Sequence, residues 1–110
     1  MTKIGEGGMP ARPTEEMYHK QLQDNITRFE NALSGYQVTN DSQEVEHLKT
    51  LMNQEMELIR SNVNEIKRLG IQKQGEIVES DYQHYRSDPT PAHLSALQQD
   101  LSTLKWEFNR

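Results

Sequence analysis

The chain has 110 residues, which supports one small domain, and it carries a net charge of −5. Its lysines and arginines are dispersed among acids, so nucleic acid is not expected as a partner, because phosphate binding needs clustered basic residues. The absence of cysteine excludes disulfides, and no apolar run approaches the ~18–20 residues of a membrane span. We expect a soluble, cytoplasmic protein, with signal-independent export as the alternative.

Residues 1–13 are rich in glycine and proline and almost free of apolar side chains, so we predict a flexible N-terminal tail. A helix at about 14–36 follows, with Thr14 as its N-cap and two acids in its first turn. Its apolar residues alternate at spacings of four and three, which predicts a heptad stripe. The stripe consists of Leu22, Ile26, Phe29, Leu33 and Tyr36.

A long amphipathic helix is predicted at 42–87, opened by a capping box of Asp41 and Glu44. Apolar residues recur there every seven positions and are flanked on both sides, so the helix should bury itself against at least two others. Gly70 and Gly75 leave a break at 70–75 as the alternative to one continuous helix. The stripe and its flanks are Val45, Leu48, Leu51, Met52, Met56, Leu58, Ile59, Val63, Ile66 and Leu69.

The two prolines at positions 89 and 91 end that helix, and Thr90 followed by Pro91 predicts the start of another. The last helix, at 91–109, carries Leu94, Leu97, Leu101, Leu104 and Phe108 in heptad rhythm. Together these elements predict an all-α fold over 14–110. We expect a three-helix bundle or a coiled-coil helical hairpin with a long middle helix.

Part of the middle-helix stripe is predicted to bind a partner helix rather than to serve only as core. Trp106 lies two positions from both Leu104 and Phe108, so it projects away from the leucine stripe. It is either an interface anchor or a cover for the second flank of the middle helix. The candidate partner-binding residues are Leu51, Met52, Met56, Ile59, Val63 and Trp106.

No catalytic motif is found, so we expect a non-enzymatic protein without a cofactor. Acid-x-x-His spacing occurs three times, as in di-iron bundles, at His19, His47 and His84. These pairs fall in first turns or on polar faces, where they serve solubility and capping. We therefore assign no metal ligand.

Residues 88–102, with the sequence DPTPAHLSALQQDLS, resemble the turn and following helix of type III secretion needle subunits. The resemblance implies turn and packing roles for Pro89, Pro91, Leu94, Gln98 and Leu101. It points to a secretion-system chaperone or assembly component that holds helical clients, and to a homo- or hetero-oligomer. The alternative is a self-assembling, needle- or filament-like subunit. A metal-binding bundle is the third alternative.

Overall fold

The computed structural model describes residues 15–109, which form four α-helices and no β-strand. The helices are α1 (Glu15–Val38), α2 (Ser42–Glu65), α3 (Leu69–Ser87) and α4 (Pro91–Phe108). The all-helical class is confirmed. The prediction of three helices with a long middle helix is wrong, because residues 66–68 separate α2 from α3. The tail predicted at 1–13 and the cap predicted at Thr14 lie outside the described residues.

The connection between α1 and α2 is short because its polar side chains satisfy the free end of α2. The Asp41 carboxylate caps α2 by accepting a hydrogen bond of 2.9 Å from the Gln43 backbone N–H. The Glu44 carboxylate accepts from the Thr39 hydroxyl at 2.5 Å, and that hydroxyl accepts from the Asp41 N–H at 3.2 Å. The predicted cap is confirmed, and Thr39 joins the two halves of the predicted capping box.

The start of α4 also follows the prediction. The Thr90 hydroxyl accepts a hydrogen bond of 3.2 Å from the His93 N–H, and Pro91 occupies the first helical position. Proline is suited to this position because it has no backbone N–H group, and the first N–H groups of a helix have no acceptor within the helix.

The break between α2 and α3 follows from a change in phase of the apolar pattern. Ile66 and Ile71 are buried, whereas Leu69 between them is 67% exposed. Five residues correspond to a rotation of about 140° around a continuous helix, which would carry Ile71 away from the face that holds Ile66. The chain instead leaves the helix at 66–68, and the break predicted at 70–75 is wrong. Gly70 is the second residue of α3, and Gly75 lies inside that helix.

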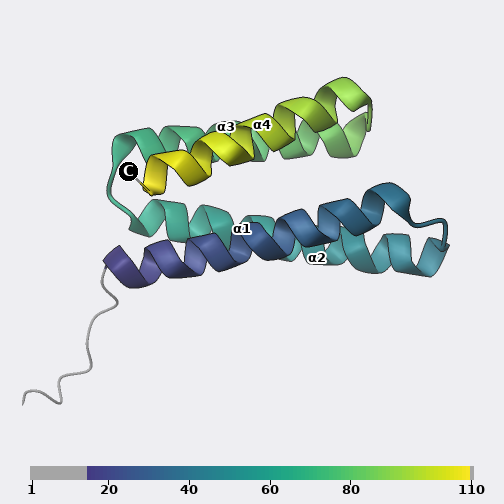
Figure 1. The fold of residues 1–110 in the computed structure, drawn as a ribbon, viewed down its shortest axis with the longest axis horizontal. Coiled ribbons are helices and arrows are strands. Elements are labelled where there is room, and N and C mark those ends of the chain that lie inside the picture. Colours follow the sequence, from purple (N-terminus) through teal and green to yellow (C-terminus); the bar gives the residue numbers. More distant parts are fainter. Residues whose placement is uncertain (1–14, 110) are drawn as a thin grey trace, which may run out of the picture.

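The four helices pack as two antiparallel hairpins, α1–α2 and α3–α4, laid against each other (Figure 1). The hairpins meet mainly between α2 and α3. The Phe29 and Tyr82 rings join them edge to face, 5.3 Å apart. One core runs between the hairpins. It consists of Leu22, Ile26, Phe29, Ala32, Leu33, Leu48, Met52, Met56, Ile59, Val63, Ile66, Ile71, Val78, Tyr82, Tyr85, Leu97, Leu101, Leu104 and Phe108.

Candidate functional site

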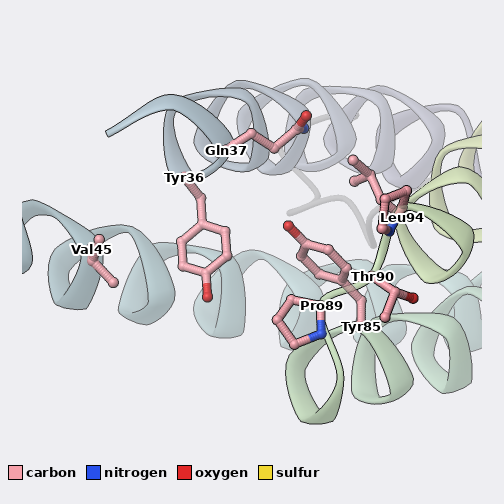
Figure 2. Close-up of a pocket in the computed structure, with 8 residues that line it drawn as sticks. Tyr36, Gln37, Val45, Tyr85, Pro89, Thr90 and Leu94 are labelled. Carbon is pink, nitrogen blue, oxygen red and sulfur yellow. The ribbon is translucent and has the colours of Figure 1, made fainter. Parts of the chain in front are cut away.

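A cleft of about 450 Å³ opens where both hairpins make their turns. All four helices and the α3–α4 turn contribute to it, so it exists only when the two hairpins are packed together (Figure 2). The lining residues are Tyr36, Gln37, Val45, Tyr85, Pro89, Thr90, Pro91 and Leu94.

Two tyrosines, one from each hairpin, meet in this cleft. The rings of Tyr36 and Tyr85 lie 6.2 Å apart at an interplanar angle of 74°, the edge-to-face arrangement that aromatic pairs favour. Burial raises the pKa of the Tyr85 hydroxyl, and the nearby Tyr36 raises it further. Both effects disfavour a phenolate, so Tyr85 offers the cleft a neutral ring and a hydroxyl.

The chemistry of the cleft is uncharged. None of the eight lining residues carries a charge, although 26% of the chain does. The polar side chains available are the hydroxyls of Tyr36, Tyr85 and Thr90 and the amide of Gln37. An ionic ligand would find no counter-charge in this lining, whereas an apolar side chain would find aromatic, aliphatic and proline surfaces.

Four of the candidate partner-binding residues lie in the core of the chain itself. Met52, Ile59 and Val63 are fully buried, and Met56 is 3% exposed. A partner would have to displace one of the chain's own helices to reach Met52, Ile59 and Val63, whereas Met56 lines a concavity between α2 and α3.

The fifth candidate, Leu51, is half-buried and lines a shallow groove of about 300 Å³ on the α1–α2 hairpin. Ala32 and Leu48 supply its other apolar walls, and Arg28 and Glu55 also line it. Leu51 is therefore more exposed than the other four stripe residues.

Trp106, the sixth candidate, is 61% exposed in the last turns of α4. Leu94 lines the cleft near the other end of the same helix, about 18 Å along the axis at 1.5 Å per residue. Trp106 is accordingly exposed, as expected for an anchor, but it lies outside the cleft.

A buried polar network lies inside the α1–α2 hairpin. The Asn25 amide donates to the Glu55 carboxylate at 3.0 Å, and the Asn62 amide donates to the Asn25 carbonyl oxygen at 2.7 Å. Arg28 supplies a counter-charge to Glu55 at 3.2 Å. Glu55 and Asn62 occupy the heptad positions between Leu48 and Leu69. These two polar residues in an otherwise apolar heptad position are the feature of the sequence from which a buried polar network could have been predicted.

A second concavity, of about 420 Å³, lies between α2 and α3. Three of its polar groups already bond to one another: the Tyr82 hydroxyl and Arg86 both donate to the Asn53 side-chain oxygen, at 2.5 and 2.7 Å. A ligand there would have to displace these bonds, so the uncharged cleft is the better candidate site.

The acid-x-x-His pairs do not assemble into a common site. Within residues 15–109, no group of three or more histidine, aspartate or glutamate side chains could hold a metal ion. His19 instead accepts a hydrogen bond from Arg68 at 2.8 Å, and its ring meets the Phe108 ring in a T-shaped arrangement.

Comparison with protein-family models, with curated proteins and with solved structures gave no match to this chain. Over the described part of the chain, no helix is long and apolar enough to cross a membrane. The functional assignment therefore depends on the geometry of the chain itself.

Proposed function

We propose that this chain is a non-enzymatic helical interaction module that takes an apolar segment of a protein partner into the cleft. The observation that carries the proposal is the uncharged lining, with Tyr36 and Tyr85 in contact across the two hairpins. Tyrosine is enriched among the residues that dominate protein interfaces, because it combines a large ring with a hydrogen-bonding hydroxyl. A volume of about 450 Å³ is suited to a few apolar side chains.

The partner that fits best is a small amphipathic helical protein of a secretion system, for which the chain would act as chaperone or assembly component. The segment that resembles type III secretion needle subunits, at 88–102, supplies half of the cleft lining: Pro89, Thr90, Pro91 and Leu94. An amphipathic helical client has an apolar face that needs cover before assembly, and an uncharged cleft can cover part of it.

Self-association into a needle- or filament-like structure is the second candidate. Several large apolar side chains are exposed on the described surface, among them Leu58, Leu69, Ile77 and Trp106. Exposed apolar side chains that gather into a patch mark association sites. Light scattering after size exclusion separates the candidates: a constant mass of one or two chains supports the module, and growth with concentration supports the filament.

The test of the module is client binding by a cleft variant. Leu94→Glu places a charge in the uncharged cleft, and Ser95→Glu adds the same charge at the exposed neighbouring position. Needle-type subunits encoded in the same genome are the clients to test, by titration calorimetry. We expect Leu94→Glu to weaken binding about tenfold or more, because a desolvated charge has no partner there. Equal affinities of the two variants for a client that binds the unmodified chain would exclude the cleft as the binding site.

A further inference from the structure

Two carboxyl groups face each other between α3 and α4. Asp81 on α3 is half-buried, and its Oδ2 atom is enclosed with no hydrogen-bond partner among the described residues. The half-buried Asp100 side chain of α4 lies within hydrogen-bond reach of Asp81. The Gln74 amide donates to the Asp100 backbone carbonyl at 2.9 Å, which fixes this part of α4 against α3.

The chemistry of this pair depends on one proton. Two ionised carboxylates are both acceptors and repel each other, whereas a carboxyl and a carboxylate can share a hydrogen bond. Burial, followed by the hydrogen bond and the charge of Asp100, raises the pKa of Asp81 to about 7, and His93 opposes this rise. A proton shared between the two groups gives Asp81 a hydrogen bond that two carboxylates cannot make.

Basic groups on the neighbouring helices are already paired. Arg60 of α2 forms an ion pair with Glu79, two residues before Asp81. Where α1 meets α4, Lys105 pairs with Glu30 at 3.0 Å. The charged groups that shift the pKa of Asp81 are Asp100, which raises it, and His93, which lowers it. The His93 Nδ1 atom lies 2.6 Å from the Asp88 carbonyl oxygen in the α3–α4 turn.

We propose that Asp81 and Asp100 form a proton-dependent catch between α3 and α4, closed when the pair holds a proton and loosened when both groups are ionised. The folded chain holds this proton more tightly than the unfolded chain, in which Asp81 has its ordinary pKa near 4. The contribution of the pair to stability is therefore greatest below about pH 4, falls as the pH rises to about 7, and is constant above that.

The catch lies close to the cleft. Asp81 is one helical turn before Tyr85, and His93 precedes Leu94. If the cleft binds a client as proposed above, loss of the proton would change client affinity near neutral pH. The catch itself does not depend on that proposal, and it is tested without a client.

The direct test follows the carboxyl carbons of Asp81 and Asp100 by NMR between pH 4 and pH 8.5. We expect one of the two to titrate near pH 7. The transition should move down in Asp100→Asn, which removes the second charge. Ordinary titration near pH 4 of both groups would overturn the proposal, and this readout needs no variant to fold.

A second readout is thermal unfolding of Asp81→Asn, whose amide imitates the protonated acid. Its midpoint temperature should match that of the unmodified chain at pH 4 and exceed it by about 5 °C at pH 8. Glu76→Gln removes one charge from an exposed position on the same helix and should show no such pH-dependent difference. His93→Gln should keep the near-neutral transition, since His93 only opposes it. The same pH dependence in Asp81→Asn and Glu76→Gln would contradict the catch.

Discussion

Asn25, Glu55 and Asn62 form a buried polar network that is satisfied only when α1 and α2 are aligned as observed. Each amide or carboxylate finds its partner on the facing helix, at 2.7 to 3.0 Å. A shift of one helix by one turn would leave these groups buried without partners, at roughly 1–3 kcal/mol for each. The network therefore stabilises one register of the hairpin over others that would bury similar apolar area.

Gly75 is the residue at which α3 approaches α2 most tightly among the described glycines. A Cβ atom placed there would lie 2.8 Å from Cγ1 of Val63, a β-branched side chain that cannot easily rotate away. We predict that Gly75→Ala lowers the free energy of unfolding by about 1–2 kcal/mol, because overpacking outweighs the gain in helix propensity. Urea denaturation followed by circular dichroism measures this difference.

Gly35→Ala is the matched control for that substitution. It also lies inside a helix, but its Cβ atom would meet the flexible Leu48 side chain at 3.4 Å, which is an ordinary contact. Gly35→Ala should be neutral or stabilising by about 0.5–1 kcal/mol. Equal stabilities of the two variants would mean that the close approach at Gly75 is not rigid.

At the scale of the helices, the shift in apolar phase after Ile66 determines where the chain turns. We predict that Ile71→Ala lowers the free energy of unfolding by about 2–4 kcal/mol, because Ile71 is 1% exposed. Leu69→Ala should change it by less than about 0.5 kcal/mol, because Leu69 is 67% exposed. Thermal and urea unfolding measure both. A large loss in Leu69→Ala would instead place Leu69 in the apolar stripe, as one continuous helix requires.

Helix ends that are marked by strong local motifs could be predicted from the sequence. Asp41, Thr90 and Pro91 cap or start helices by bonds within their own neighbourhood, so these ends could be predicted from short motifs. The end of α2 has no such signal, because residues 66–68 contain neither glycine nor proline. Leu69 fits the heptad spacing of the apolar stripe, so the pattern predicted one continuous helix where the structure has two.

The candidate site was less predictable than the helices, because it depends on the packing of the two hairpins. Tyr36 and Tyr85 are far apart in sequence and meet only after the turn at 66–68 folds α3 back. The sequence pattern of methionine and isoleucine in α2 is equally consistent with buried core residues and with an exposed docking surface. Whether these residues are buried depends on how α3 and α4 pack against α2, which a local sequence pattern does not specify.

At the scale of the whole molecule, the cleft and Trp106 lie near opposite ends of α4 and on different faces. The twelve residues from Leu94 to Trp106 correspond to about 18 Å along the axis and a rotation of about 120°. One short apolar segment cannot contact both. If Trp106 also anchors a partner, as its sequence position predicts, it does so as a separate contact whose energy adds to that of the cleft.

This independence gives a prediction for a client that binds the unmodified chain. Trp106→Ala should keep the helical circular dichroism signal, because the side chain is 61% exposed, and should weaken binding about tenfold. Combined with Leu94→Glu, the loss should multiply to about 100-fold, since contacts this far apart contribute additively in free energy. Calorimetric titration of the single and double variants measures both losses of affinity.

Unchanged binding by Trp106→Ala would exclude the anchor and leave the cleft as the sole contact. A double variant no weaker than Leu94→Glu would mean that the two residues act through one contact, which would require the client or the helix to bend between them.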